Sequence, residues 1–351
     1  MKFSVVIATY NRADELPKTL ESLAKLRVVD TWELILVDNN SSDNTRELVL
    51  KAAETFPVPL HYLQESEQGR SAALNTGIKA SQGEIIAITD DDVRVEPDWL
   101  TNGARALQYF ECDYLGGKAL PIWGGKRPSW IPEGRSIHWA VIALLDYGPE
   151  PIPLGDYVPL GVNMIFRRDA FDRAGLWDNT IGRKAGTLLG QEVREWVQRA
   201  RAANVKGFYS PSLVIHHVIP AERLTKKYFR RWFYWHGISR AILYQTKGLD
   251  MESPESMELD FSTVPHIAGV PRYMYRTYLH SFLSMITALI RGDAVTVFAN
   301  ELELCFFAGV LKERWRERRQ PIPPRQKFDD SARQLTNNES HHSRRRQRSA
   351  S

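Results

Sequence analysis

Short apolar runs alternate with helix-spaced apolar positions along the first hundred residues of the chain. The first run is FSVVIA at residues 3–8. The apolar positions that follow it recur at the spacing of one helix face: Leu16, Leu20, Leu23 and Leu26. The alternation continues with ELILVD, a helix that Asp43 would cap, LHYLQ, a helix around 72–78 and EIIAITD. Strands that alternate with helices predict an α/β fold with a mostly parallel sheet flanked by helices.

The pattern changes after residue 115. Residues 116–159 are rich in Gly, Pro and Trp and poor in periodicity, and we interpret them as an ordered excursion that faces a substrate. LGVNMIFRR then predicts a strand, GQEVREWVQRARAA a helix, and FYSPSLVIHH the strand that closes the sheet.

These patterns divide the chain into three parts. Residues 1–220 are predicted to form one α/β domain, with halves at 1–115 and 116–220. The next part is helical, aromatic and basic, which predicts a helical extension at 221–319. Residues 320–351 lose their apolar content, and we expect a disordered basic tail there.

Charge and cysteine content exclude some classes of protein. The chain has 46 Lys and Arg against 42 Asp and Glu, a net charge of +4, and much of the excess lies between Lys312 and Arg348. The body is close to neutral, so charge does not indicate a nucleic acid partner. Cys112 and Cys305 are far apart and lack metal-ligand spacing, which is typical of a reducing compartment.

The ends and the apolar runs predict a cytoplasmic protein. The amino terminus enters a strand at once, without the regions of a signal peptide. No apolar run reaches the roughly 18 residues of a membrane span. Arg291 ends one candidate, and Glu301 and Glu303 interrupt the next. We therefore expect no transmembrane anchor.

Polar residues follow three of the predicted strands. Tyr10, Asp38 and Asp90 each come after a strand, and ligands of parallel sheets gather at the carboxyl ends of strands. Asp38 could accept hydrogen bonds from a base or ribose, or could form an Asx turn with residues 39–41. Tyr10 could stack on a base or pack at the sheet edge, and Arg12 could contact phosphate.

The triplet Asp90, Asp91 and Asp92 is the sharpest chemical signal in the chain. Consecutive carboxylates repel one another unless a cation neutralises them. Mg²⁺ or Mn²⁺ suits this role, because either metal can bridge a carboxylate to a diphosphate. The alternative is a solvated acidic turn ahead of a helix that begins near Pro97.

Taken in order, the segments FSVVIATYNRADELPKTLESL, LILVDNNSSDNT and QGRSAALNTGIKASQGEIIAITDDDV resemble the family 2 glycosyltransferases. The resemblance covers roughly residues 1–245 and implies a GT-A fold, with nucleotide-binding and acceptor halves at 1–115 and 116–220. It implies that Asp90 lies near the ribose and Asp92 on the metal. With the assignments above, the predicted nucleotide-sugar site comprises Ala8, Tyr10, Arg12, Asp38, Arg70, Asn75, Asp90 and Asp91.

Two positions depart from the family pattern. Leu74 precedes Asn75 where the family often has Arg, so Arg70 is the candidate to supply that charge. Gln191 and Glu192 stand where the family has a Glu-Asp pair, which leaves Glu192 alone at the position that resembles the catalytic base.

A base is needed if the transfer inverts the anomeric centre, because the acceptor hydroxyl must lose its proton. Glu192 is that candidate, and its alternative is an ordinary first-turn acid of a helix. The resemblance extends through PLGVNMIFRRDAF, where Gly161 and Asn163 match a donor-side or acceptor-side strand. We assign these two residues and Trp130 to the acceptor side.

The pair His216 and His217 follows the strand SLVI. By resemblance, His216 matches the family's histidine and would join Asp92 at the metal. The side chain of His217 should point to the other face of the sheet, so we expect it to be a bystander.

The helix pattern in LTKKYFRRWFYWHGISRAIL combines aromatic and basic residues. Two alternatives stay open, a helix at an anionic membrane surface and a helix packed on the catalytic domain. The later segments YLHSFLSMITALI and AVTVFANELELCFFAGVL suit a helical hairpin or an interfacial position.

The sequence thus predicts an inverting, Mn²⁺- or Mg²⁺-dependent transfer from a nucleotide-sugar donor, UDP- or GDP-linked, to a hydroxyl of a glycan or lipid-linked acceptor. Such a reaction belongs to cell-surface polysaccharide or glycolipid synthesis, in the cytoplasm or peripherally on the inner face of the membrane. One alternative is a silent glycan-binding or scaffold protein. Another is a nucleotidyltransferase, which would need a glycine-rich loop after the first strand, where no glycine occurs before Gly69.

Overall fold

The computed structural model describes residues 2–131, 137–154, 157–247 and 265–317. Met1–Arg314 forms one compact unit, and a second unit begins at Trp315. Residues 318–351, which include the predicted tail, lie outside the described part of the chain.

The described strands form a nine-stranded sheet with the order β3-β2-β1-β4-β8-β6-β9-β5, to which β7 adds through β9. Strands β1 to β4 are parallel to one another, whereas β8 runs antiparallel to β4 and β6. The strands are β1 (Phe3–Thr9), β2 (Trp32–Asp38), β3 (Leu60–Gln64), β4 (Ile85–Thr89), β5 (Val93–Val95), β6 (Tyr114–Trp123), β7 (Ile152–Pro153), β8 (Asn163–Arg167) and β9 (Gly207–Ile219). The α/β class and the mostly parallel sheet predicted from the sequence are confirmed.

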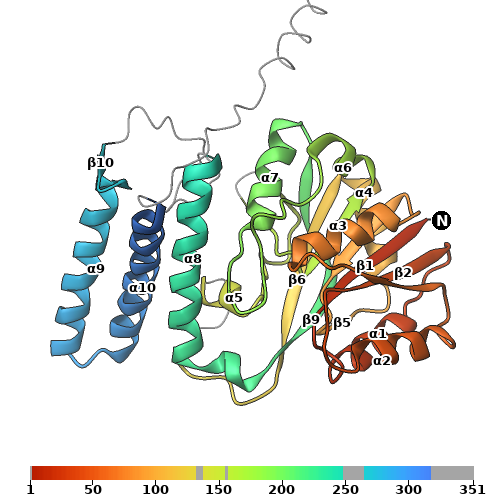
Figure 1. Cartoon of the computed structure of the whole chain (residues 1–351), viewed down its shortest axis with the longest axis horizontal. Coiled ribbons are helices and arrows are strands. Elements are labelled where there is room, and N and C mark those ends of the chain that lie inside the picture. Colours follow the sequence, from red (N-terminus) through yellow and green to blue (C-terminus); the bar gives the residue numbers. More distant parts are fainter. Residues whose placement is uncertain (1, 132–136, 155–156, 248–264, 318–351) are drawn as a thin grey trace, which may run out of the picture. The chain divides into compact units, whose positions relative to one another are not determined.

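Helices cover both faces of this sheet (Figure 1). Odd-numbered residues of β1, such as Val5, face α1, α2 and α4, and the even-numbered Val6 faces α3, α6 and α7. Both faces are dry, so β1 and β2 are nearly continuous apolar runs. The helices are α1 (Leu16–Ala24), α2 (Thr45–Ala53), α3 (Arg70–Ala80), α4 (Trp99–Tyr109), α5 (Ile137–Val141), α6 (Asp169–Ala174) and α7 (Glu192–Ala202).

The carboxy-terminal region is helical and packs in a third apolar cluster, which it shares with Ile131, Ile142 and Ile219. It comprises the 3₁₀ turn η1 (Ala221–Leu224), α8 (Lys226–Lys247), a β10 (His266–Ile267) and β11 (Val270–Pro271) hairpin, α9 (Arg272–Ile290) and α10 (Ala294–Glu317). Aromatic side chains from α8, α9 and α10 pack together in this core. They include Phe229, Phe233, Tyr278, Phe298 and Phe306.

Helices α8 and α10 approach each other closely through a pair of glycines. A Cβ atom at Gly237 would lie 2.0 Å from the carbonyl oxygen of Phe306, and one at Gly309 would lie 2.0 Å from that of Tyr234. Each helix therefore presents a glycine to the backbone of the other. Helix α8 also contacts the segment before α7 through Ser239 and Arg231, as the packed alternative from the sequence requires.

One described helix, 294–316, has the length and apolar composition of a membrane-spanning segment, and 28% of its apolar window is buried. The acids at 301 and 303 therefore interrupt the apolar run without ending the helix. Glu301 pairs with Arg230 at 2.8 Å, and burial raises the pKa of Glu303. Length and composition of this kind also occur in core helices of proteins outside membranes.

We expect Gly309→Ala to lower the free energy of unfolding by about 2 kcal/mol, because the added methyl group meets backbone and forces the two helices apart. Urea unfolding followed by circular dichroism measures this loss. The matched control is Gly125→Ala, whose methyl group would have ordinary contacts from 3.5 Å outward. Equal stability of the two variants would contradict the close packing.

Candidate functional site

A cavity of about 1050 Å³ opens at the carboxyl ends of β1 and β4. Its walls are the loop after β1, the acidic triplet after β4, the turn before β8, the segment that leads into α7, and one side of α8. Nine of the residues predicted from the sequence line it: Ala8, Tyr10, Arg12, Arg70, Asp90, Asp91, Asp92, Gly161 and Glu192.

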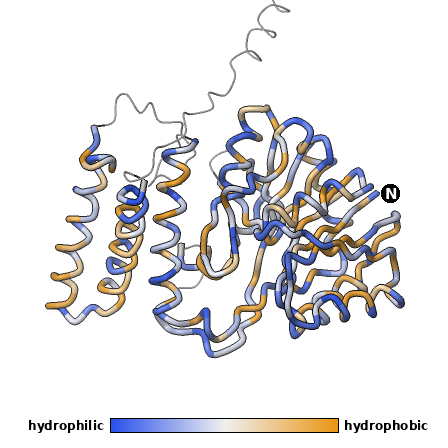
Figure 2. Tube along the Cα trace, in the orientation of Figure 1, coloured by the Kyte–Doolittle hydropathy of each residue, from blue (hydrophilic) through white to orange (hydrophobic). Residues whose placement is uncertain are grey.

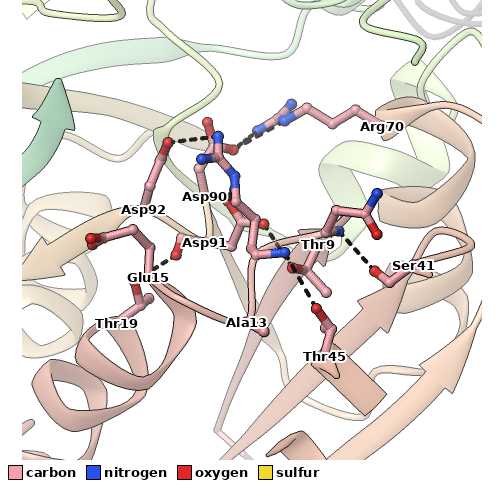
Figure 3. Close-up of polar contacts among 12 residues, drawn as sticks. Thr9, Ala13, Glu15, Thr19, Ser41, Thr45, Arg70, Asp90, Asp91 and Asp92 are labelled. Carbon is pink, nitrogen blue, oxygen red and sulfur yellow. Dashed lines mark hydrogen bonds and ion pairs between the residues drawn. The ribbon is translucent and has the colours of Figure 1, made fainter. Parts of the chain in front are cut away.

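Asp91 is buried and is held from two sides. Its carboxylate accepts a hydrogen bond of 2.7 Å from the hydroxyl of Thr9, and its carbonyl accepts one of 2.7 Å from Thr19 (Figure 3). Burial and the neighbouring charge of Asp92 raise the pKa of Asp91 to about 7. These contacts fix the turn that presents the other two acids.

Asp92 lies among three cationic or basic groups. Arg12 Nη2 is 3.2 Å from its Oδ2, Arg223 Nη2 is 3.8 Å from the same oxygen, and His217 Nε2 is 3.2 Å from its Oδ1. Burial alone would raise the pKa of Asp92, but His217, Arg223 and Arg12 outweigh it and hold the pKa well below its ordinary value. Asp92 is thus an ionised carboxylate at the cavity wall.

The histidine beside Asp92 is His217, which corrects the assignment of His216 to the metal. His217 is buried, and its Nδ1 contacts the carbonyl of Ile142 at 3.1 Å. His216 points to the opposite face and pairs with Glu96 at 2.8 Å. The two side chains do lie on opposite faces, as the strand period requires. Which one meets the acids depends on the pairing of β9 with β5, where His217 stands opposite Val93.

Arg70, the first residue of α3, connects both halves of the cavity. Its Nε and Nη2 donate to Asp90 Oδ1 at 3.0 and 2.6 Å, and Nη2 also donates to the carbonyl of Gly161 at 2.9 Å. Its Nη1 lies 3.6 Å from Glu192 Oε1. Burial alone would lower the pKa of Arg70, but the charges of Asp90 and Glu192 outweigh burial and raise the pKa above its ordinary value. Figure 3 shows Arg70 reaching across to Asp90.

Glu192 is the first residue of α7, and its side chain is 13% exposed. The residue before it, Gln191, has a left-handed backbone with φ of 83°. Gln191 Nε2 lies 3.3 Å from Nδ1 of His236 on α8. Burial, with Arg240 and Arg194 nearby, lowers the pKa of His236 well below its ordinary value, so His236 is a neutral partner.

Four predicted site residues have other roles in the structure. Asn163 is fully buried, where it accepts from Trp99 Nε1 at 2.9 Å and donates to two backbone carbonyls. Asn75 exchanges hydrogen bonds with the backbone of Trp177. Both amides satisfy polar backbone groups inside the protein. This corrects the assignment of Asn163 to the side of the acceptor substrate and of Asn75 to the nucleotide-sugar site.

Trp130 packs edge to face against Phe229 and Phe298 in the helical core and is not part of the cavity lining. Asp38 is also absent from the lining. Its two oxygens accept from the backbone of Ser41 and from Tyr62, each at 2.8 Å. Burial and this bond raise the pKa of Tyr62 to about 12. The first of these bonds is the local turn considered as the alternative for Asp38.

Sequence reasoning missed several lining residues, namely Arg183, Lys184, Arg194, Arg223, His236 and Arg240. They lie on the segment before α7, on α7 itself, on η1 and on α8. An excess of cations in these segments was visible in the sequence. Their convergence on the cavity was not, because it depends on how these separate elements fold together.

Residues 4–175 match the family model described as Glycosyl transferase family 2. A glucosyl-dolichyl phosphate glucuronosyltransferase of Haloferax volcanii is 23% identical over 69% of this chain and 77% of its own. The succinoglycan biosynthesis protein ExoM of Rhizobium meliloti is 26% identical over 66% of this chain and 72% of its own.

Among solved structures, the mannosyltransferase PcManGT of Pyrobaculum calidifontis, in complex with GDP-Man and Mn²⁺, has a similar fold. It superposes with a TM-score of 0.60 at 19% identity, over 90% of this chain and 88% of its own.

We expect Arg70→Ala to lower the free energy of unfolding by about 2–3 kcal/mol, because it leaves Asp90, Glu192 and the Gly161 carbonyl without their donor. Urea unfolding measures the loss, and Arg105→Ala on the exposed side of α4 is the control. A loss no larger than that of the control would show that Arg70 does not hold the cavity together.

Proposed function

We propose that this chain, a glycosyltransferase of family 2 with the GT-A fold, transfers one sugar, with inversion, from a nucleoside diphosphate sugar to a hydroxyl group. The proposal rests on one observation. A single cavity contains the ionised Asp92, an array of cationic side chains and a carboxylate, Glu192, at the start of a helix.

The cationic side chains suit a diphosphate. Arg12 and Arg223 contact Asp92 and line the same cavity, and Lys184 lines the wall ahead of α7. Guanidinium groups bind phosphate oxygens through paired hydrogen bonds. Tyr10 is 40% exposed, so its ring is available to stack on a base, and Asp90 would contact the ribose.

The residues present fit a divalent cation. The Nδ1 atom of His217 faces the carbonyl of Ile142, which can only accept, so Nδ1 is the donor there and Nε2 is the ring atom that faces Asp92. A metal ion at this point would bind the Nε2 lone pair of the neutral form of the ring. The 3.2 Å between Nε2 and Oδ1 is close to the roughly 3 Å between adjacent ligands of an octahedral ion. No cluster of three such ligands occurs among the described residues, and substrate phosphates and water commonly supply the rest.

Asp92 and His217 would therefore hold the Mn²⁺ or Mg²⁺ ion, which would neutralise charge on the departing diphosphate. The remaining chemistry belongs to Glu192. Its carboxylate takes the proton of the acceptor hydroxyl while that oxygen bonds to the anomeric carbon. The bond from this carbon to the diphosphate breaks, and the nucleoside diphosphate leaves with the electron pair. Attack opposite the leaving group inverts the anomeric centre.

Arg70 would position the base rather than react. It joins Glu192 to Asp90, so the carboxylate that takes the proton is fixed relative to the donor. Glu192 is the first residue of α7, where the positive end of the helix dipole interacts favourably with a carboxylate.

The relatives support a choice of acceptor class. The Haloferax volcanii protein is named for a dolichyl phosphate-linked sugar, and ExoM for succinoglycan biosynthesis. We propose a lipid-linked or glycan acceptor and a role in glycolipid or polysaccharide synthesis at the cytoplasmic side of a membrane. A UDP- or GDP-linked sugar is the donor in this proposal.

We expect Glu192→Gln to reduce kcat by about 10²- to 10⁴-fold, because the amide cannot take the proton. Turnover is measured with Mn²⁺ and a panel of UDP- and GDP-sugars. Thermal shift with the same donors should remain as in the wild type, since Gln keeps the shape of the side chain. Unchanged kcat would exclude Glu192 as the base. Donor binding by the wild-type protein without turnover on any acceptor would favour a silent binding protein.

We expect His217→Ala to raise the Mn²⁺ concentration that gives half-maximal activity by about 10- to 100-fold, because loss of a group at a metal site lowers the affinity for the metal. His216→Ala is the matched control and should behave as the wild type, because that ring pairs with Glu96 outside the cavity. Manganese titrations of activity compare the two. If His216→Ala raised the required Mn²⁺ concentration and His217→Ala did not, His216 would be the metal ligand.

A further inference from the structure

Helix α9 presents a row of large apolar side chains to solvent. We call the row the α9 stripe, and its members are Leu279, Phe282, Leu283, Ile286, Leu289 and Ile290. Leu289 is 68% exposed and Ile290 81%. Figure 2 shows hydrophobic colour along α9. An exposed apolar surface of this kind marks a site of interaction.

The stripe is a second face of α9, separate from the face that packs. Met274, Tyr278 and Ala288 are buried on the packed face, where Tyr278 stacks on Phe307 of α10 with ring centroids 4.4 Å apart. The helix therefore has its core contacts already, and the apolar residues of the stripe are in excess of what the fold needs.

Basic residues continue the stripe at both ends. Arg272 and Arg276 precede Leu279 at the same alternating spacing of four and three, and Arg291 follows Ile290. All three arginines are exposed. A helix of 19 residues is about 28 Å long, so an apolar centre lies between two cationic ends.

The charges on α9 favour a lipid surface over a second copy of the chain as the partner of the α9 stripe. Helix α9 contains no Asp or Glu, and the nearest acid after it, Asp293, accepts a hydrogen bond from the Thr296 backbone at the start of α10. A second copy of the chain would bring arginines against arginines with no acid in the stripe to pair them. Lipid phosphates would pair them, and acyl chains would take the apolar centre.

Sequence patterns alone left α8 open between an anionic membrane surface and a packed position, and they allowed an interfacial position for residues 278–290 and 294–311 as well. In the structure, α8 packs in the helical core and lines the cavity through Trp232, His236 and Arg240. Its aromatic residues therefore pack within the protein, and most of the exposed large apolar side chains among the described residues of this region lie on α9.

We propose that the α9 stripe docks the protein on an anionic lipid surface, with the helix lying in the plane of the interface. The leucine, isoleucine and phenylalanine side chains enter the acyl boundary, and the arginines at each end contact headgroup phosphates. The proposal concerns location and does not depend on the sugar transferred or on Glu192 as a base.

Co-sedimentation of the full chain with vesicles tests the proposal. The vesicles are phosphatidylcholine alone or phosphatidylcholine with 30% phosphatidylglycerol, and both are used at low and high salt. The double variant L283S/I290S leaves every charge in place, including those of the basic segment 344–348. We expect this double variant to lower partitioning onto the anionic vesicles by about tenfold or more, because it removes two apolar side chains that would enter the lipid.

The matched control is L50S, which removes an exposed leucine from α2 and should bind as the wild type. R272E/R276E should also lower partitioning, with the difference shrinking at high salt. Thermal unfolding of each variant should stay near that of the wild type, since surface substitutions usually change stability by less than about 0.5 kcal/mol.

Two results would overturn the proposal. One is equal vesicle binding by L283S/I290S and the wild type, which would assign binding to other basic segments. The other is a lipid-free dimer of the wild type that L283S/I290S converts to a monomer without any vesicle binding, which would make the stripe a subunit interface. Sedimentation velocity measures the second. Loss of vesicle binding with sugar transfer in solution intact would separate docking from catalysis.

Discussion

Three carboxylates in succession at the end of β4 are the constraint around which the rest of the cavity is organised. Like charges at this distance cost free energy unless opposite charges and hydrogen bonds compensate them. Each carboxylate of the triplet has its own compensating partners. Asp90 pairs with Arg70, Asp91 accepts from Thr9, and Asp92 lies among Arg12, Arg223 and His217. These partners come from three separate stretches of sequence, residues 9–12, Arg70 and residues 217–223, so the triplet connects distant parts of the chain.

Helix α8 completes this arrangement from the carboxy-terminal side. The Gly190 backbone donates to Ser239 at 3.2 Å, Gln191 contacts His236, and Arg231 donates to the carbonyl of Gly186 at 3.0 Å. The segment that leads to Glu192 is therefore held by a helix that also packs against α10. Through these contacts, the close approach of α8 and α10 at their two glycines affects the position of the proposed base.

The sheet was predictable because alternation and apolar runs are local signals. The lining residues Tyr10, Arg12 and Asp90 were predictable for the same reason, since a residue that follows a parallel strand lies at a known edge. The choice between His216 and His217 was not, because it depends on the register of β9 against β5. Asn75, Asn163 and Trp130 were misassigned because a polar or aromatic residue near a site can serve the interior equally well.

The structure accounts for a leucine at position 74, where the family pattern often has an arginine. Leu74 is fully buried in the core between α3 and the sheet. Arg70 lies one helical turn earlier on the same face of α3, where the helix begins beside the strand ends. From there its guanidinium reaches Asp90, the Gly161 carbonyl and Glu192 together. Gly161 leaves room for this, because a Cβ atom there would lie 3.1 Å from Arg70 Nη1. Arg70 thus supplies a positive charge at the rim of the cavity, and Leu74 serves the core.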